Sequence, residues 1–393
     1  MIWQTNELSK ICKIGDGAHA SLKRIKSGIP YLTAKNIIKS GVDYSNMDYI
    51  SEETYNKHFK KKSNALTQPE KDDILYSIIG SIGGVYVVQD EKIGISSSVA
   101  IFRANTDVVI PRYLAYFLKS ADFDAQIQAI KGGVAQGFMS LGKLGSVNIS
   151  YPEDIKYQEK IVDILSSYDD LIENNQKQIK LLEEATQRLY KEWFVDLRFP
   201  GYEDVAIVDG VPEGWQKEKL IDIADVQYGF AFDGSLFNSQ GKGTPIIRIR
   251  NIPRGTTSDY TIQEADDQYI VSNGDIVVGM DGEFHINSWS GETAYLVQRT
   301  CKFTPKKELM RGWLLQAIYE PIKFFEKTVV GATVAHLGKK HIDTIELLTG
   351  PDDLYAPFND LFNKRQLLLN QNILLSEARD RLLPKLMSGE IEV

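Results

Sequence analysis

The sequence predicts an α+β protein that contains two similar mixed α/β domains and two long helices. Three observations support this fold class. The chain has 393 residues, more than one hydrophobic core usually organises. Landmarks in its first half recur in its second half. Two long segments also carry apolar residues in a heptad pattern. With 43% hydrophobic and 25% charged residues, the composition is that of an ordinary globular protein.

The repeat consists of four blocks of matching residues that keep their order along the chain. The first block matches at one constant spacing: Trp3, Leu8, Ile11, Ile14 and Gly17 with Trp215, Leu220, Ile223, Val226 and Gly229. The later blocks match at drifting spacings: Pro30, Asn36 and Ile37 with Pro245, Asn251 and Ile252; Asp73, Ile74 and Gly80 with Asp275, Ile276 and Gly282; and, more loosely, Gly133 and Pro152 with Gly331 and Pro351. Conserved order with drifting spacing indicates one duplicated fold whose surface loops differ in length.

Within each copy, apolar runs predict a small mixed sheet. The predicted strands cover residues 31–38, 74–79, 85–88 and 99–102 in the first copy, and 245–249 and 276–278 in the second. Residues 112–119 and 313–318 have helical patterns. The turn-rich stretch 198–215 reads as a linker.

Each copy is followed by a long helical segment, 153–194 and 353–387. Their apolar stripes contain Ile161, Tyr168, Ile172 and Leu182 in the first segment, and Leu361, Leu368, Leu375 and Leu382 in the second. Such a repeat is typical of a coiled coil, and Asn175 and Asn372 on the stripes would fix its register. Two amphipathic helices, each packed on its own domain, remain the alternative.

The second helix can bury its leucines by running back along the first. The predicted fold is therefore an antiparallel two-helix coiled coil that separates two domains related by a pseudo-twofold axis. The predicted boundaries are 1–152 for the first domain, 153–197 for the central helix, 198–351 for the second domain and 352–393 for the distal helix.

Short motifs argue against catalysis by this chain. Pro351-Asp352 lacks the following acidic-x-Lys of a restriction nuclease, no two prolines are adjacent as in an amino-methyltransferase loop, and no Pro-Cys is present. The stretch 137–143 has the spacing of a phosphate-binding loop, but Leu144 replaces its hydroxyl residue. The five histidines have no metal-ligand spacing. We therefore predict no catalytic residue, no metal and no bound cofactor.

The net charge of −8 is unevenly distributed. Residues 1–150 hold 18 Lys+Arg against 14 Asp+Glu, whereas the later segments are acidic. The basic run 57–62 is either a solvated loop or a phosphate contact. Two distant cysteines and the lack of a long apolar segment predict a cytoplasmic protein without a membrane span.

Polar residues at matching places of the two copies are candidate nucleic-acid contacts. Arginine can read guanine, asparagine adenine, and lysine can contact phosphate, although the shared asparagines could equally cap turns. The glycine-rich loops 132–137 and 331–336 suit phosphate oxygens or plain tight turns. The candidates are Lys35, Asn36, Lys60, Lys61, Gln136, Lys143, Arg248, Arg250, Asn251, Thr333, His336 and Lys339.

Four stretches resemble one family over the whole chain: Tyr157-Gln-Glu-Lys-Ile-Val, Leu189-Tyr-Lys-Glu-Trp-Phe, Val211-Pro-Glu-Gly-Trp and the tail from Leu382 to Val393. Together with the duplication, they make the chain similar to the specificity (S) subunit of type I restriction-modification enzymes. One departure is Leu354-Tyr-Ala-Pro-Phe at the second helix, where Pro357 should delay the helix start.

The resemblance implies a non-catalytic DNA-binding subunit. Each domain would be a target-recognition domain that reads half of a bipartite site in double-stranded DNA. The helices would set the spacing and dock two methyltransferase (M) subunits and restriction/translocase (R) subunits, which would hold S-adenosylmethionine, ATP and Mg. A structural spacer that binds proteins at both domains, or an enzyme of an unrecognised type, are the rival hypotheses.

Overall fold

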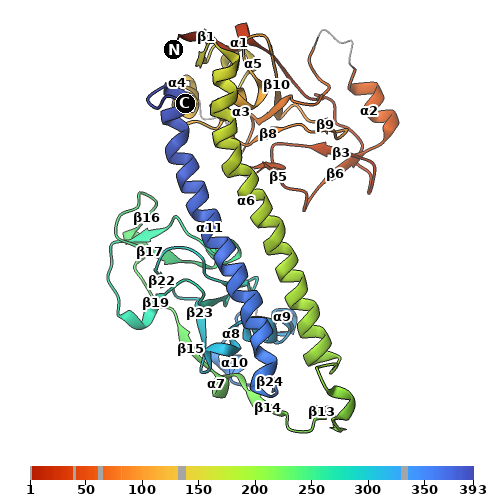
Figure 1. Ribbon diagram of the computed structural model, residues 1–393, viewed down its shortest axis with the longest axis vertical. Helices are drawn as coiled ribbons and strands as arrows, with labels where there is room; N and C mark the ends of the chain where they lie inside the picture. Colours follow the sequence, from red (N-terminus) through yellow and green to blue (C-terminus); the bar gives the residue numbers. More distant parts are fainter. Residues whose placement is uncertain (1, 39–40, 61–64, 81, 132–138, 329–334) are drawn as a thin grey trace. The chain divides into compact units, whose positions relative to one another are not determined.

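The computed structural model describes residues 2–38, 41–60, 65–80, 82–131, 139–328 and 335–393. The chain divides into two compact units, which are shown with their elements in Figure 1. The first unit consists of Met1–Asp170 together with Ser376–Val393, and the second unit consists of Leu171–Leu375. Both long helices therefore contribute residues to both units.

A four-stranded antiparallel sheet forms the centre of the first unit. Its strands lie in the order β2 (Cys12–Asp16), β10 (Val99–Ala104), β7 (Ile74–Ser77) and β8 (Val85–Val87). Successive residues of β10 belong to different cores, because side chains alternate across a strand. Ala100 and Phe102 join the core under α3 (Pro111–Leu118), and Val99 and Ile101 join a core on the opposite face.

A second, smaller sheet covers that opposite face. β3 (Ile29–Leu32) pairs antiparallel with β6 (Asp48–Ile50) and parallel with β9 (Gly94–Ile95). Apolar residues of these strands share one core with β10. The short hairpin of β4 (Ile37–Ile38) and β5 (Gly41–Val42) follows β3 after a turn.

The remaining elements close the first unit. β1 (Trp3–Glu7) pairs with β11 (Asn148–Pro152), so distant parts of the chain meet in one ladder. The short helices are α1 (Leu8–Ile11), α2 (Glu52–His58), α4 (Ala121–Lys131) and α5 (Leu141–Gly145).

The second unit repeats this plan. Its central sheet has the order β15 (Ala224–Tyr228), β23 (Thr300–Pro305), β20 (Ile276–Gly279) and β21 (Ile286–Ser288), and β14 (Gln216–Lys219) pairs with β24 (Glu346–Thr349). Its smaller sheet has the order β16 (Phe237–Asn238), β18 (Tyr260–Thr261), β17 (Thr244–Ile247), β22 (Ala294–Leu296) and β19 (Ile270–Val271). β17 and β22 are parallel, as β3 and β9 are in the first unit.

The second unit also contains several short helices. Its α-helices are α7 (Leu220–Ile223), α8 (Arg311–Ala317), α9 (Tyr319–Thr328) and α10 (Lys339–Ile342). Its 3-10 helices are η2 (Tyr202–Asp204), η3 (Gly234–Leu236), η4 (Ile249–Arg254), η5 (Asp267–Tyr269), η6 (Glu308–Met310) and η7 (Asp352–Tyr355). The expected linker contains η2 and a small hairpin of β12 (Ile207–Val208) and β13 (Val211–Pro212).

The matching glycines Gly17 and Gly229 have the same structural reason in both units. A Cβ atom on either glycine would lie 2.1 Å from a main-chain carbonyl oxygen, that of Ile95 or that of Val297. Only a residue without a side chain allows the backbones to cross so closely. The glycine that recurs in the sequence therefore marks the same close approach of two backbone segments in both units.

The two long helices run antiparallel to each other within each unit. α6 (Ile155–Tyr190) ends in a π-helical turn, η1 (Lys191–Val195), and α11 (Ala356–Ser388) follows η7. In the first unit, Arg379 of α11 pairs with Asp169 of α6 at 2.6 Å. In the second unit, the Asn175 amide donates to the Asn372 side-chain oxygen at 3.0 Å, as expected for residues that fix a register.

The predicted stripe residues differ in how deeply they are buried. Ile161 and Leu368 are buried. The others are half-buried, namely Tyr168, Ile172, Leu182, Leu361, Leu375 and Leu382. The predicted fold class, with two similar α+β units and an antiparallel pair of long helices, is confirmed.

Two predicted strands are too long. Residues 31–38 form two strands, because the turn after β3 interrupts them, and the strand predicted over 245–249 ends at Ile247, where the backbone enters η4. The predictions around β7, β8, β10, β20, α3 and α8 are confirmed within a few residues. Pro357 lies in the first turn of α11, where its missing N–H has no helical partner to lose.

In the part of the chain that the structure describes, no helix combines the length and apolarity needed to span a bilayer.

Candidate nucleic-acid interface

Asn36 shapes the turn that follows β3. Its side-chain oxygen accepts hydrogen bonds from the backbone N–H of Thr33 at 3.0 Å and from the Thr33 hydroxyl at 2.9 Å. Its amide group donates to the backbone carbonyls of Asp43 at 3.3 Å and Asn46 at 3.4 Å. Because the side chain is buried and its hydrogen bonds are filled within the chain, Asn36 has the turn role.

Asn251 has the corresponding role after β17. Its oxygen accepts from the backbone N–H of Arg248 at 2.8 Å, and its amide donates to Asp259 at 3.1 Å. Asn251 is also buried. Of the two alternatives for the shared asparagines, the structure therefore supports the turn, and neither amide is free to contact a base in this conformation.

The cation that precedes each asparagine is exposed and paired with an aspartate. Lys35 is 58% exposed and its Nζ lies 3.5 Å from Asp48. Arg250 is 62% exposed and pairs with Asp259.

The two aspartates occupy equivalent ladder positions. Pro30 stands opposite Tyr49 in the first unit, and Pro245 stands opposite Tyr260 in the second. Asp48 and Asp259 immediately precede these tyrosines. The duplication has therefore preserved a cation–aspartate cluster beside the turn, and not only the hydrophobic core.

In the second unit, the cluster holds a guanidinium in two hydrogen bonds. The Nε and Nη2 atoms of Arg250 donate to the two carboxylate oxygens of Asp259, at 3.2 and 2.5 Å. Burial alone raises the pKa of Asp259, but the hydrogen bonds from Arg250 and Asn251 outweigh it and hold that pKa below its usual range. Arg248 lies over the Phe237 ring, 5.6 Å from its centre.

In the first unit, two cations share the carboxylate. Arg24 Nε lies 3.4 Å from the same Asp48 oxygen that Lys35 approaches. The Arg24 guanidinium stacks on Tyr31, 4.1 Å from the ring centre, and donates to the carbonyl of Leu22 at 2.8 Å. The strongly held guanidinium of this cluster is therefore Arg24, and Lys35 is the more loosely held cation.

Sequence reasoning missed Arg24, Asp48 and Asp259. A signal for the aspartates was present, because the dipeptide Asp48-Tyr49 recurs as Asp259-Tyr260 after the matching asparagines. Arg24 stands in the basic stretch Lys23-Arg24-Ile25-Lys26, but its counterpart in the second copy is not a similar stretch. Its role follows from the stacking on Tyr31, which only the fold brings about.

The remaining predicted contacts lie on other parts of the two units. Lys60 follows α2 and Lys143 lies on α5, and both are exposed. Lys339 pairs with Asp343 at 2.8 Å, and the Nδ1 atom of His336 lies 2.6 Å from Asp281, which also pairs with Arg299. Lys61, Gln136 and Thr333 lie outside the described residues.

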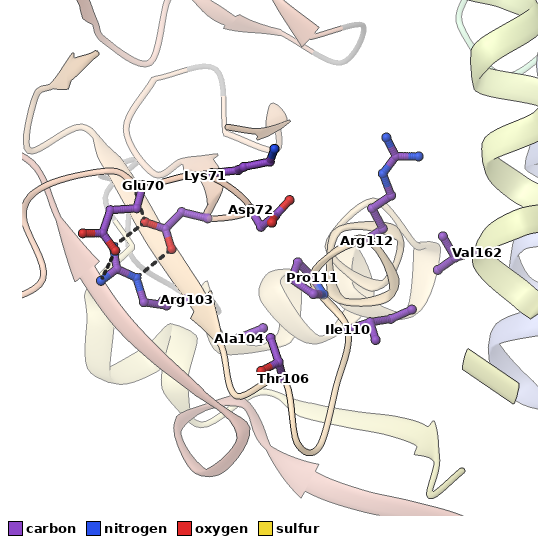
Figure 2. Close-up of a pocket in the computed structure, with 11 residues that line it drawn as sticks. Glu70, Lys71, Asp72, Arg103, Ala104, Thr106, Ile110, Pro111, Arg112 and Val162 are labelled. Carbon is purple, nitrogen blue, oxygen red and sulfur yellow. Dashed lines mark hydrogen bonds and ion pairs between the residues drawn. The ribbon is translucent and has the colours of Figure 1, made fainter. Parts of the chain in front are cut away.

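A hollow of about 520 Å³ in the first unit has one charged wall, which has a structural role (Figure 2). On its wall Asp73 accepts two hydrogen bonds from Arg103, at 2.8 and 2.7 Å, and one from the backbone N–H of Glu70. The matching Asp275 accepts from the backbone N–H of Ser272, at 2.8 Å, and contacts Arg311 and Lys302. The charged groups on this wall thus pair with one another and stabilise a turn. The same turn is present in the second unit.

Comparisons with known proteins agree with this architecture. A family model described as "Type I restriction modification DNA specificity domain" matches residues 2–184 and 212–351. The type I restriction enzyme MjaIX specificity subunit of Methanocaldococcus jannaschii is 26% identical over 423 residues, which cover 100% of this chain and 94% of the relative. The HindI specificity subunit of Haemophilus influenzae is 23% identical over 401 residues, covering 82% of this chain and 87% of the relative.

A solved structure has the same fold. The S subunit of a type I restriction-modification system from M. genitalium aligns with 98% of this chain and 96% of its own chain, with a TM-score of 0.56 and 15% sequence identity.

Proposed function

Because the chain belongs to the type I restriction modification DNA specificity family, we propose that each of its units reads one half of a bipartite DNA site. The resemblance to type I specificity subunits is confirmed by the family match and by relatives that carry that name, and so is the prediction that this chain is not the catalytic component. The proposal adds how the chain divides the recognition between its two units.

The observation that supports this division most strongly is the repeated cluster of an exposed cation and an aspartate. Lys35 with Asp48 and Arg250 with Asp259 occupy matching places in two folds of the same plan. A duplicated hydrophobic core would need no such cluster. Exposed cations at fixed positions are what a unit needs to approach a phosphate or a base edge.

The other exposed basic side chains would add contacts with DNA. We assign phosphate contacts to Lys60 and Lys143 in the first unit, and to His336 and Lys339 in the second. Lys61, Gln136 and Thr333 complete the proposed set.

The paired helices would set the distance between the two half-sites and bind partner subunits. The proposed parts are 1–152 and 198–351 for DNA, and 153–197 and 352–393 for spacing and docking. Two methyltransferase subunits and the restriction/translocase subunits would bring S-adenosylmethionine, ATP and Mg to a cytoplasmic complex. The acidic balance of the first long helix fits a surface that faces protein and not phosphate.

The direct test combines this chain with its methyltransferase partner on a library of random DNA. We expect methylation at a consensus of two short specific parts separated by a fixed gap. Methylation without sequence preference would contradict the proposal and favour a spacer that binds only proteins.

A second test assigns each half-site to one unit. Replacing residues 1–152 by the corresponding part of another family member should change one half of the consensus and leave the other unchanged. A change in both halves after this replacement would contradict the assignment.

A third test addresses the helices. Deleting seven residues from both long helices should shorten the gap or abolish activity, since a heptad is the smallest deletion that keeps the stripe in register.

A further inference from the structure

Arg250 keeps one edge of its guanidinium free. Of the five N–H groups of an arginine, the one on Nε and one on Nη2 are used by Asp259. The other three, two on Nη1 and one on Nη2, have no hydrogen-bond partner among the described residues. The side chain is 62% exposed. The aspartate thus holds one edge of the planar group and leaves the opposite edge available as a two-pronged donor.

We propose that Arg250 reads a guanine in the half-site of the second unit, and that Asp259 is the positioning residue that orients its guanidinium. This inference rests on the proposed function and assigns one base contact to one side chain. The contact would join the free Nη1–Nη2 edge to the O6 and N7 acceptors on the major-groove edge of the guanine, which a planar fork matches with two parallel N–H donors.

The aspartate favours a base edge over a phosphate as the target. Asp259 is only 15% exposed and lies directly against Arg250, so it offsets much of the positive charge that would attract a phosphate. The three unused N–H groups of Arg250 remain available as directional donors, because Asp259 offsets the positive charge without binding them. Holding the side chain before binding also lowers the entropy lost when the contact forms.

The orientation of Asp259 is itself fixed by the fold. Its carboxylate accepts a third hydrogen bond from the amide of Asn251, and its backbone N–H donates to the Thr257 hydroxyl at 3.0 Å. Asn251 in turn holds the backbone of Arg248. The buried turn and the exposed arginine are therefore connected through one carboxylate, which explains why the two matching residues Arg250 and Asn251 stand side by side in the sequence.

The first unit has no arginine at the matching place that could make this guanine contact. Lys35 carries a single ammonium group, which has no planar fork, and its aspartate is shared with Arg24. The guanidinium of Arg24 is held by Asp48, by the Leu22 carbonyl and by the ring of Tyr31. We therefore assign the guanine contact to the second unit alone.

The test compares the wild-type chain with Arg250→Lys, each assembled with its methyltransferase partner on random DNA. Lysine keeps the charge and loses the fork. We expect the consensus to lose one guanine in one half-site, with a fall in discrimination at that position of about 5- to 150-fold, while the other half is unchanged. Arg198→Lys is the control, because Arg198 is an exposed arginine in the turn-rich stretch 198–215 and is assigned no contact with DNA or a partner subunit.

Binding to a modified base makes the test independent of methylation. In the identified site, 7-deazaguanine at that position removes the N7 acceptor only. It should weaken binding of the wild-type complex and leave binding of the Arg250→Lys complex nearly unchanged.

Asp259→Asn tests the positioning role. The wild-type preference for guanine should fall at the same position, with the rest of the consensus and the melting temperature near wild type, and Asp259→Glu should recover part of it. A purely structural role would lower the melting temperature and weaken all positions together.

The outcomes separate the inference from the proposed function. If the wild-type complex shows no split consensus, both are wrong. If it shows one and Arg250→Lys leaves every position unchanged, or weakens binding equally for all sequences, the guanine assignment alone is wrong and Arg250 is a phosphate contact or a surface residue.

Discussion

The clusters around Asp48 and Asp259 have the same backbone and different cations. Each aspartate directly precedes a tyrosine that pairs with a proline of the neighbouring strand, β3 or β17. Each aspartate also pairs with a cation from the turn that follows that neighbouring strand. In the first unit the carboxylate is shared by Arg24 and Lys35, whereas in the second unit it binds one arginine in two hydrogen bonds. The comparison teaches that a duplicated fold can keep the carboxylate that orients a contact and change the group that makes it.

The aspartates Asp73 and Asp275, which are 2% and 15% exposed, show the opposite behaviour. Each accepts a hydrogen bond from the backbone N–H three residues earlier and pairs with cations from elsewhere in its unit. These pairs brace the central sheet, so both units need them. The cations beside the turns can therefore diverge, whereas the ion pairs that brace the central sheets are kept in both units.

The largest expected effect comes from removing Asp73 or Asp275. Asp73→Ala removes a carboxylate that is 2% exposed and accepts two hydrogen bonds from Arg103, at 2.8 and 2.7 Å, and should destabilise the first unit by about 3 to 5 kcal/mol. Asp275→Ala should destabilise the second unit by less, because its contacts with Arg311 and Lys302 are longer, at 3.4 and 3.5 Å, and Arg311 keeps two hydrogen bonds to Glu308.

The two cysteines report on the two units separately. Burial raises the pKa of the Cys12 thiol to about 12 and also raises that of the Cys301 thiol. Neither thiol should therefore react while its unit is folded. Labelling in increasing urea should show Cys301 exposed earlier in Asp275→Ala, and Cys12 exposed earlier in Asp73→Ala. Earlier labelling of both thiols in either variant would contradict the assignment of each pair to one unit.

A second prediction compares the polar contacts of the long helices. Asn175→Ala leaves the side chain of Asn372 without its partner in the second unit and should destabilise the helix pair there by about 1 to 3 kcal/mol. Asp169→Asn in the first unit should cost less than about 1 kcal/mol, since its pair with Arg379 is partly exposed. Hydrogen exchange of α6 measures both, and an equal loss of protection around both residues would refute the ranking.

A third prediction is that the preference for guanine can be transferred from the second unit to the first. Lys35→Arg places a planar fork beside Asp48 and should add a preference for guanine at one position of the first half-site. Discrimination should rise by no more than about 1 to 3 kcal/mol, because Asp48 is already shared with Arg24. Sequencing of methylated random DNA measures it, with Lys71→Arg as the control, because Lys71 is also an exposed lysine paired with an aspartate. A new preference in the second half-site would show that the units are assigned to the wrong halves.

The smallest expected effect is a pH dependence of the Asp259 pair. The pKa of Asp259 in the folded chain lies below the ordinary value of 3.8. Its contribution to stability is therefore present above pH 3.8 and is lost as the pH falls through the lower, folded value. The free energy of unfolding should differ between wild type and Asp259→Asn by less than about 1 kcal/mol at pH 6, because the partner Arg250 is 62% exposed. A difference that stays the same as the pH falls through the titration of Asp259 would contradict this assignment of the charge.

The sequence predicts the parts of the fold that depend on patterns. Three patterns predicted the duplication, the two long helices and the contact of Asn175 with Asn372. These patterns are the glycines at 17 and 229, the heptad stripes and the matching asparagines. It did not predict that β3 and β17 end early, because the interruption depends on the hydrogen bonds of Asn36 and Asn251 and not on the apolar pattern.

The site could be predicted only in part. Lys35 and Arg250 were found because they adjoin a matching asparagine. Asp48 and Asp259 lie further along the chain, at a different distance from the turn in each copy, and they reach these cations only through the pairing of strands. Arg24 depends on the stacking of its side chain on Tyr31, which no local pattern encodes.

The division of the chain into units has a consequence for its synthesis. The second unit is a continuous stretch, whereas the first unit needs Ser376–Val393, whose Leu386 is buried in its core and whose Val393 N–H donates to the Tyr157 hydroxyl at 2.9 Å. A ribosome delivers the N-terminal part of the first unit before the second unit, and residues 376–393 only after it. The unit that is started first is therefore finished last, and until translation reaches residue 393 the apolar side of α6 in that unit stays open to chaperones and proteases.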